Sequence, residues 1–231
     1  IPSIIRQYYA ERKLIKRDML DAQQEYEKTP TKALSNKIAT LDNSQMSIKI
    51  LMNSLYGALG NRWFRYFDQR VAESITLAGQ LSIKWAERAV NFEMNSLLKT
   101  DEKDYVIAID TDSLYINMED LVTQFSPKDP VKFLDKICSE HFEKVLVKSY
   151  KDLAHYTNAF KNRMEMGREV IADRAIWCAK KRYILNVHNN EGVQYAEPKL
   201  KVMGIEAVKS STPMVVRDKM KEMFHILVKG T

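Results

Sequence analysis

The stretch KILMNSLYGALGN, residues Lys49–Asn61, decides how the first part of this chain folds. It closes a helical pattern whose apolar residues, at turn spacing, form the single stripe that a core helix needs. It also carries a second stripe, which offers a cation, an amide and a phenol on another face. The members of this second stripe stand at i, i+4, i+7 and i+8: Lys49, Asn53, Tyr56 and Gly57. The stretch by itself fits two interpretations, a solvated face that ends in a glycine cap and a face that binds a ligand.

Helical periodicity continues on the N-terminal side of this stretch. Apolar residues recur at turn spacing from about Ser3 to Lys28 and again from about Lys32 to Leu55. The segment Thr29-Pro30-Thr31 interrupts the pattern. Two long helices joined by so short a turn predict an antiparallel helical hairpin.

The hairpin is expected to gather positive charge on one face. With its turn near Pro30, residue i faces roughly residue 60 − i, so Arg12 should lie across from the Lys49 region. Lys16 follows Arg12 one turn further along the same side. Exposed helices usually interleave glutamate with lysine, whereas this face concentrates cations, which favours an anion-binding site over a solvated surface. The predicted hairpin face consists of Arg12, Lys16, Lys49 and Asn53.

The pattern changes after the hairpin. A third amphipathic helix is predicted from Gln69 to about Leu98. Two short strands follow, Tyr105–Ile109 and Leu114–Ile116, around a tip of sequence Asp-Thr-Asp-Ser. A helical pattern then covers about Pro130 to Lys151. The expected core face of the third helix is formed by Val71, Ile75, Ala78, Leu81, Trp85 and Ala89.

The last part of the chain returns to strand patterns and ends in a helix. Short strands are predicted at Met164–Ala172, Ala175–Cys178 and Arg182–Val187, and Asn189-Asn190-Glu191-Gly192 indicates a turn. A final amphipathic helix should begin after Ser211-Thr212-Pro213, which supplies an N-cap and a first-turn proline. Helices followed by mixed strands and helices indicate an α+β fold, with a small mixed or antiparallel sheet packed on long helices.

Composition limits the classes of protein to be considered. The chain has 231 residues, of which 45% are hydrophobic and 29% charged, as in a globular protein with a sizeable core. No apolar run approaches the roughly 20 residues that span a bilayer, and no signal peptide opens the chain, so no membrane partner is expected. Cys138 and Cys178 form no spaced framework, which favours a reduced intracellular compartment. The net charge of +6 weakly favours a polyanionic partner, and the opening Ile1 leads us to expect a piece of a longer protein.

A pair of carboxylates lies between the two short strands. If Asp110 and Asp112 both continue the strand, they project to the same side, because residues i and i+2 share a face. Two like charges so close repel unless a cation lies between them, and carboxylate oxygens suit Mg²⁺. An ordinary polar turn explains the same residues, and nucleotide-sugar transferases also use an Asp-x-Asp motif. Together with a cationic face that can hold a triphosphate, the pair favours phosphoryl transfer assisted by two metal ions.

Three motifs of the chain resemble those of one protein family. Lys49-Ile-Leu-Met-Asn53-Ser-Leu-Tyr56-Gly57 resembles the KxxxNSxYG motif of family B DNA polymerases. Ile109-Asp110-Thr-Asp112-Ser113 resembles their DTDS motif, and Lys180-Lys181-Arg182-Tyr183 resembles their KxY motif. The motifs stand in the family's order, the likeness covers essentially the whole chain, and replicative polymerases of tailed phages are the most similar type. The resemblance divides the chain into a fingers hairpin (1–57), a palm (58–208) and the start of a helical thumb (209–231).

The resemblance also implies roles for residues at matching positions. Asp112 would be the principal metal-bridging carboxylate, and Tyr56 with Gly57 would pack under the nascent base pair. Nucleotide binding is implied for Arg12, Lys16, Lys49, Asn53 and Tyr56. Catalysis is implied for Asp112, Asp110 and Lys49, and metal binding for Asp112, Asp110 and Glu169. DNA contact is implied for Gly57, Lys181, Arg182, Tyr183, Lys199, Lys201 and Lys209.

For a complete enzyme, the resemblance implies template-directed DNA synthesis, the transfer of a deoxynucleotide to a primer 3′-hydroxyl with two Mg²⁺ ions. The implied partners are primer–template DNA, deoxynucleoside triphosphates, the remainder of the polymerase and a sliding clamp. The implied location is the cytoplasm of an infected bacterial host.

The chain departs from the family's pattern in several places. Ala108-Ile109 precede the carboxylates where the family usually has Tyr-Gly, and Gly167 stands where many relatives have Asp. The family's upstream DxxSLYPS motif, which supplies a metal-bridging Asp, does not occur in this sequence. We therefore expect the isolated chain to bind DNA and nucleotides with little or no synthesis. Two alternatives stay open, a nucleotide-sugar transferase built around the Asp-x-Asp and a non-catalytic DNA-binding remnant of a polymerase.

Overall fold

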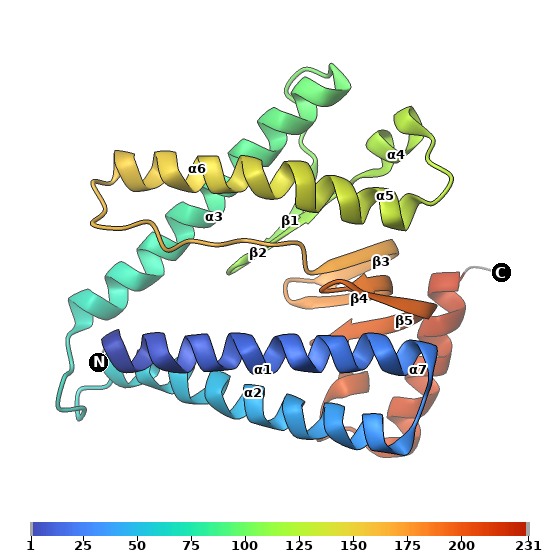
Figure 1. Ribbon diagram of the computed structural model, residues 1–231, viewed down its shortest axis with the longest axis horizontal. Coiled ribbons are helices and arrows are strands. Elements are labelled where there is room, and N and C mark those ends of the chain that lie inside the picture. Colours follow the sequence, from blue (N-terminus) through green and yellow to red (C-terminus); the bar gives the residue numbers. More distant parts are fainter. Residues whose placement is uncertain (1, 230–231) are drawn as a thin grey trace. The chain divides into compact units, whose positions relative to one another are not determined.

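The fold is that of an α+β protein, as the sequence predicts. The computed structural model describes residues 2–229 and contains long helices and two small antiparallel sheets (Figure 1). Contacts divide the chain into two compact units, with the boundary between Leu81 and Ser82 inside a long helix.

The first unit is built on an antiparallel helical hairpin. Helix α1 (Pro2–Lys28) and helix α2 (Lys32–Leu59) run side by side over most of their length (Figure 1). The hydroxyl of Thr31 accepts a hydrogen bond from the Leu34 backbone N–H at 3.2 Å, which caps the start of α2. The hairpin prediction is therefore confirmed, and α2 continues past Leu55 to Leu59.

Helix α3 (Gln69–Leu98) has the predicted bounds but a different core face. Four of the six predicted members, Val71, Ile75, Ala78 and Leu81, are exposed, whereas Trp85 and Ala89 are half-buried and Trp85 packs against the core. The buried face lies in the second half of the helix and consists of Ser82, Ile83, Ala86, Val90 and Met94. The prediction therefore holds only in part, because the helix has apolar residues on two neighbouring faces and periodicity alone does not tell which one is covered.

The second unit contains the larger core. The second half of α3 packs with the hairpin of β1 (Val106–Asp110) and β2 (Ser113–Ile116) and with helix α4 (Glu119–Phe125). Helix α5 (Pro130–Ile137), a π-helical segment η1 (Cys138–Phe142) and helix α6 (Glu143–Tyr156) complete it. A single helical pattern was predicted from about Pro130 to Lys151. The structure has two helices there, and the π-helical segment between them changes which side chains face the core. The most deeply buried residues of this core are Ala86, Val90, Met94, Tyr105, Leu121 and Tyr150.

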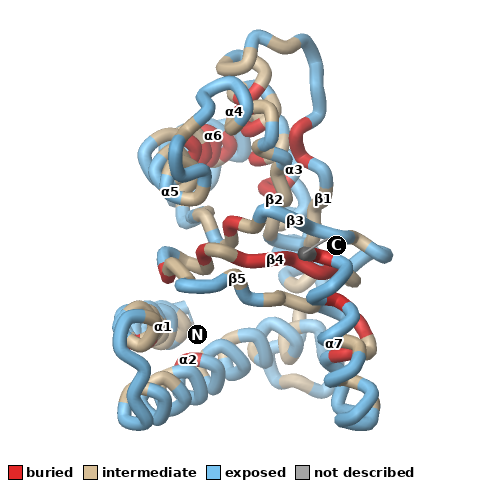
Figure 2. The backbone as a smooth tube through the Cα atoms, turned by 90° about the vertical axis from the view of Figure 1, so that its right-hand side faces the viewer, coloured by how far each residue is buried: buried red, intermediate tan, exposed pale blue. Residues whose placement is uncertain are grey.

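A three-stranded antiparallel sheet forms the other part of the second unit. Its order is β3 (Val170–Ala179), β4 (Arg182–Asn190) and β5 (Val193–Met203). The central strand β4 is the most continuously buried (Figure 2). A 3₁₀ turn η2 (Glu206–Val208) and helix α7 (Met214–Lys229) follow, and Phe224 and Val228 of α7 pack on this sheet.

The strand predictions for this sheet hold only in part. The predicted final helix and the turn before Gly192 are confirmed. Strand β3 is continuous where two short strands were predicted, and residues 164–169 lie outside it. Strand β5 was not predicted, because Pro198 and the lysines beside it weaken its strand pattern. Proline is tolerated there because β5 is an edge strand.

Candidate polymerase site

The two carboxylates lie at the tip of the β1–β2 hairpin. Asp110 ends β1 and pairs with Ser113 of β2, which leaves Thr111 and Asp112 as a two-residue turn. Thr111 adopts a φ of 53°, and the Asp112 backbone N–H donates to the Asp110 carbonyl oxygen at 2.6 Å. The expectation that both carboxylates continue one strand was therefore wrong, because Asp-Thr-Asp-Ser forms the turn itself. Both carboxylates still stand at one hairpin tip.

The two carboxylates have different surroundings. Asp110 Oδ1 accepts a hydrogen bond from the Thr111 hydroxyl at 3.0 Å and lies 3.2 Å from the Lys181 ammonium nitrogen. The Asp112 side chain is exposed and makes no hydrogen bond or ion pair with a described residue. Their oxygens are of the type that a hard divalent cation prefers. Within residues 2–229, however, no group of three or more Asp, Glu, His or Cys side chains is gathered to hold a metal ion.

Lys181 belongs to the two-residue turn between β3 and β4. Ala179 pairs with Arg182 across this turn, and Lys181 has a φ of 63°. Gly204, just after β5, has a φ of 67° and lies against the Lys181 backbone. A Cβ added at Gly204 would come within 2.1 Å of the Lys181 carbonyl oxygen, so only glycine fits there.

An aromatic cluster joins the carboxylate hairpin to the three-stranded sheet. The ring centroid of Tyr115 on β2 lies 5.4 Å from that of Trp177 on β3 and 5.4 Å from that of Tyr183 on β4. Tyr183 is only 8% exposed, and its burial, together with a hydrogen bond to Tyr115, raises the pKa of its phenol. Negative charge from Glu169 and Asp110 raises it further. The KKRY segment and the DTDS hairpin thus meet in space, and the buried Tyr183 ring packs between the two sheets.

Four of the cations with an implied DNA contact are paired with carboxylates of the same chain. Lys181 pairs with Asp110, and Lys201 pairs with Glu169, with 3.2 Å between nitrogen and oxygen in each case. Glu206 Oε1 accepts from Arg182 at 2.5 Å and from Lys209 at 2.9 Å. The Lys209 hydrogen bond is the largest cause that lowers the pKa of Glu206 to about 2. We call Lys181, Arg182, Lys201 and Lys209 the paired cations.

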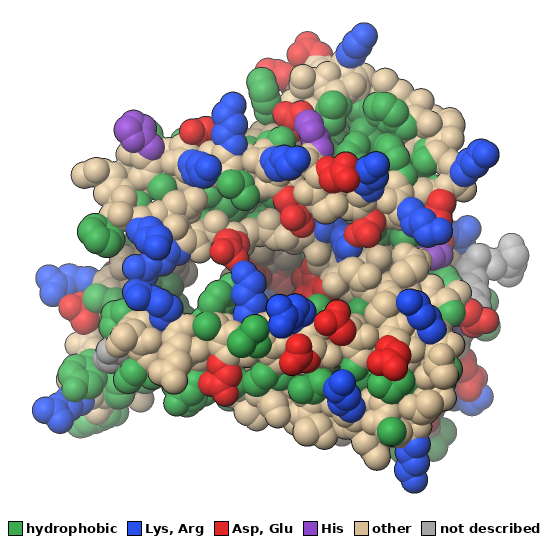
Figure 3. Space-filling view, viewed as in Figure 1, with side chains coloured by type: hydrophobic (Ala, Val, Ile, Leu, Met, Phe, Trp, Pro, Cys, Tyr) green, Lys and Arg blue, Asp and Glu red, His purple; other side chains and the backbone are tan. Residues whose placement is uncertain are grey.

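The remaining implied DNA contact on this sheet is Lys199. Its ammonium nitrogen lies 4.1 Å from the ring centroid of Tyr195, a cation–π contact on the same strand. Figure 3 shows acidic and basic side chains intermingled on the face that it displays.

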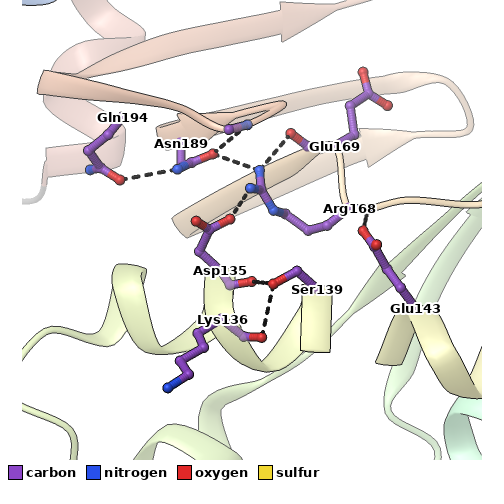
Figure 4. Close-up of polar contacts among 9 residues, drawn as sticks. Asp135, Lys136, Ser139, Glu143, Arg168, Glu169, Asn189 and Gln194 are labelled. Atoms are coloured by element: carbon purple, nitrogen blue, oxygen red, sulfur yellow. Dashed lines mark hydrogen bonds and ion pairs between the residues drawn. The ribbon is translucent and has the colours of Figure 1, made fainter. Parts of the chain in front are cut away.

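Glu169 is positioned by its neighbour Arg168, which the sequence did not single out. The Arg168 guanidinium is bonded to the carboxylate of Asp135 on α5 and donates to Asn189 Oδ1 at 2.6 Å (Figure 4). Glu143 Oε1 accepts from the Arg168 backbone N–H at 3.1 Å. Figure 4 also shows the Glu169 carboxylate pointing away from this cluster. The Arg168 cluster therefore fixes the backbone that enters β3 and leaves the Glu169 carboxylate free to meet Lys201.

The hairpin face of the first unit is arranged around Gln45. Gln45 is buried, and its Oε1 accepts from Arg12 Nε at 3.2 Å while its Nε2 donates to Asp42 at 2.9 Å. Arg12 thus lies opposite Gln45, one turn away from the predicted Lys49 level. Lys49 follows Gln45 by one turn on the same stripe of α2. In this register Lys16 and Lys49 lie about two turns, ~11 Å, apart along the hairpin axis.

The residues of this face differ in how they are held. Lys49 and Asn53 are exposed, and neither side chain makes a hydrogen bond or ion pair with a described residue. The Tyr56 hydroxyl is 2.7 Å from the Thr76 hydroxyl on α3, which orients the phenol. Gly57 lies inside α2 and Gly60 caps it, so a glycine cap does not explain Gly57. A Cβ at Gly57 would meet nothing within 4 Å.

Several residues that shape these sites were not found by sequence reasoning. They act by holding a predicted residue, and nothing in their local pattern distinguishes them from ordinary polar or small residues. Only Gly204 gave a signal, since a glycine directly after a strand pattern often marks a close backbone approach. These supporting residues are Gln45, Thr76, Tyr115, Arg168, Gly204 and Glu206.

Residues 1–231 match the family model described as DNA polymerase family B. The chain therefore belongs to DNA polymerase family B. This confirms the resemblance drawn from the three motifs and sets aside the nucleotide-sugar transferase.

Named relatives agree with this family. The chain is 42% identical over 193 residues to the DNA-directed DNA polymerase of Escherichia phage RB69, which covers 78% of this chain and 21% of the relative. It is 39% identical over 201 residues to the DNA-directed DNA polymerase of Enterobacteria phage T4, covering 80% of this chain and 22% of the relative. The DNA polymerase catalytic subunit of Alcelaphine herpesvirus 1 (strain C500) is 24% identical over 242 residues, covering 99% of this chain and 20% of that subunit. The chain thus spans about a fifth of the length of these relatives.

Throughout residues 2–229, no helix is both long enough and apolar enough to cross a bilayer.

Proposed function

We propose that this chain carries the fingers (1–57), palm (58–208) and first thumb residues (209–231) of a DNA-directed DNA polymerase. Within that polymerase, these parts would take part in the template-directed addition of deoxynucleotides to a primer 3′-hydroxyl. The observation that carries the proposal is the contact between two motifs that lie far apart in the sequence. Lys181 of the KKRY turn reaches Asp110 of the DTDS hairpin at 3.2 Å. The KKRY turn and the DTDS hairpin, which share no local sequence pattern, thereby meet beside the exposed carboxylate of Asp112.

The carboxylates would hold divalent metal, which family B DNA polymerases need. Carboxylate oxygens fit Mg²⁺, and Asp112 is the more available of the two because its side chain has no partner among the described residues. Bound metal would supply positive charge where negative charge develops on the transferred phosphoryl group. Negative charge from both Glu169 and Asp110 raises the pKa of Tyr183, which supports a role for Glu169 beside the two carboxylates. Further ligands would come from other parts of a larger polymerase.

The hairpin face would bind the phosphates of the incoming nucleotide. Gln45 and Asp42 hold Arg12 in place, so its guanidinium is oriented before any ligand arrives. Lys49 and Asn53 offer an ammonium and an amide without a competing partner among the described residues. Staggered cations along about two helical turns suit a chain of phosphates, which accepts several charge-assisted hydrogen bonds. Tyr56, held by Thr76, would test the shape of the nascent base pair.

The partners in this proposal are primer–template DNA, deoxynucleoside triphosphates, a sliding clamp and the remaining parts of a polymerase, in the cytoplasm of an infected bacterium. The phage relatives are about four times as long as this chain, which supports an action within a larger enzyme. We expect the isolated chain to bind DNA and nucleotides with little or no synthesis. Robust Mg²⁺-dependent primer extension by the chain alone would contradict that expectation.

The decisive experiment removes one carboxylate from the complete polymerase. Asp112→Ala should abolish primer extension, because no described neighbour can replace its oxygens, while DNA affinity stays within about twofold because no phosphate contact is lost. Primer extension and fluorescence-anisotropy titration with a duplex measure the two quantities. Asp101→Ala is the matched control, an exposed carboxylate outside the hairpin tip, and should extend primers normally. An unaltered rate in Asp112→Ala would leave the segment as a non-catalytic DNA-binding remnant.

A further inference from the structure

The carboxylates at the hairpin tip have unequal access to a cation. Asp110 is 28% exposed on its side chain and already faces an ammonium group, that of Lys181. Asp112 is exposed and has no such partner among the described residues. The pair is therefore half neutralised by the protein itself.

Lys181 is fixed at its backbone and free at its ammonium end. Its backbone is set by a φ of 63° in the β3–β4 turn and by the close approach of Gly204 to its carbonyl oxygen. Its side chain is 61% exposed, and among the described residues its ammonium pairs with Asp110, at 3.2 Å. An exposed lysine has several rotatable bonds, so the ammonium can leave Asp110 without any movement of the turn.

A divalent cation and the Lys181 ammonium compete for the same carboxylate. A cation bound by Asp110 would lie within about 4 Å of the ammonium if both remained, and like charges at that separation repel. The exposed ammonium is the group that can move. The ammonium of this ion pair is largely exposed to solvent, which weakens the pair, so its loss does not prevent the exchange.

We propose that Lys181 is an exchangeable counter-cation of Asp110. In the absence of a divalent cation it neutralises this carboxylate, and it is displaced when the divalent cation binds. The released ammonium then becomes available to a phosphate of bound DNA, so divalent binding strengthens DNA binding. By linkage, bound DNA strengthens divalent binding by the same factor. The DNA half of this exchange rests on the proposed function, whereas the metal half does not.

The other paired cations provide a contrast within the same chain. Lys209 forms an ion pair of the same type with Glu206, at 2.9 Å, and its side chain is 43% exposed. That pair lies outside the hairpin tip, and a divalent cation at Asp110 and Asp112 has no reason to break it. Lys209 is therefore the matched control for Lys181.

The first test uses Mn²⁺ alone, with no DNA or nucleotide, and measures its affinity by electron paramagnetic resonance. Lys181→Ala and Lys181→Gln should each bind Mn²⁺ about three- to tenfold more tightly than the unmodified protein, because a competing charge is removed. Lys209→Ala should leave the affinity unchanged. Circular dichroism of each variant checks that the fold is retained. Equal Mn²⁺ affinity in the Lys181 variants and the unmodified protein, or no Mn²⁺ binding in any of them, would overturn the exchange.

The second test measures duplex affinity against salt concentration, with and without Mn²⁺. For the unmodified protein, the slope of log affinity against log salt should become steeper by about one when Mn²⁺ is present, as one more phosphate is neutralised. This increment should vanish in Lys181→Ala and persist in Lys209→Ala, which also corrects for Mn²⁺ bound by the DNA. An increment that survives Lys181→Ala would overturn the coupling. Neither test involves nucleotide incorporation, so a protein that fails to extend primers can still pass both.

Discussion

The hairpin face and the paired cations are both rich in lysine and arginine, yet they differ in what surrounds the charge. On the hairpin, Lys49 is exposed without a partner among the described residues, and Arg12 is held by the neutral Gln45. On and beside the three-stranded sheet, four cations each face a carboxylate of the same chain. A cation without a carboxylate is ready to receive an anion, whereas a paired cation must first give up its partner.

This difference separates two tasks that a net charge of +6 cannot distinguish. Strong binding of a small, highly charged anion requires preorganised and unpaired donors. A surface over which a long polyanion must pass benefits from weaker contacts, and local carboxylates weaken every phosphate contact by competition.

The largest effect is expected at Gly204, which lies against the backbone of the paired cation Lys181. Gly204→Ala should lower the free energy of unfolding by about 3 kcal/mol, because a Cβ there meets the Lys181 carbonyl oxygen at 2.1 Å and φ is 67°. Urea unfolding measures this loss. Gly192→Ala is the control, since Gly192 has a φ of 91° but a Cβ there meets nothing within 4 Å. It should cost only about 1 kcal/mol. Equal losses would mean that the approach of Gly204 to Lys181 adds nothing to backbone strain.

The next largest effect is expected at Lys49 on the hairpin face. In the complete polymerase, Lys49→Ala should lower kcat/KM for the incoming nucleotide about tenfold, which is one lost charge-assisted hydrogen bond of roughly 1.5 kcal/mol. Single-nucleotide incorporation at a series of nucleotide concentrations measures it. Lys37→Ala removes an exposed lysine from the same helix, away from the predicted face, and should leave kcat/KM unchanged. Should both variants behave alike, the hairpin face would be an ordinary solvated surface.

The comparison also shows which features of this molecule can be predicted from sequence. Helix bounds follow from local periodicity, and α3 begins and ends where the pattern places it. Its core face does not follow, because the choice between two apolar stripes depends on what packs against the helix. The hairpin tip at Asp-Thr-Asp-Ser was predicted and is confirmed, but the expectation that both carboxylates project from one strand was wrong, since Asp112 lies in the turn.

Contacts between distant segments account for the rest. Sequence identified Lys181, Arg182 and Lys209 as candidate DNA contacts, but it could not show that Asp110 and Glu206 already hold them. The same reason hid the Arg168 cluster, whose partners come from α5 and from the end of β4. Such pairings depend on the folded arrangement and leave no local periodicity.

The smallest effect is expected at Glu206, whose side chain is half-exposed. Its carboxyl should titrate with a pKa of about 2 in place of the ordinary value of 4.5, chiefly because Lys209 hydrogen-bonds the ionised form. A pKa that is lowered on folding stabilises the protein above the ordinary value, and this contribution is lost as the pH falls from 4.5 towards 2. Carbon-13 NMR of the Glu206 carboxyl, followed downwards from neutral pH, measures the midpoint.

Variants of Lys209 and Arg182 measure how much each cation lowers the pKa of Glu206. Lys209→Ala should raise the Glu206 midpoint most, because the Lys209 hydrogen bond is the largest cause of the lowered pKa, and Arg182→Ala should raise it less, because the charge of Arg182 is a smaller cause. Both shifts should shrink in high salt, since the groups are exposed to solvent. If Glu206 already titrated near 4.5 in the unmodified protein, its two cations would be loosely associated. They would then be as free to meet phosphate as Lys49, and the contrast between the two regions would be confined to Lys181 and Lys201.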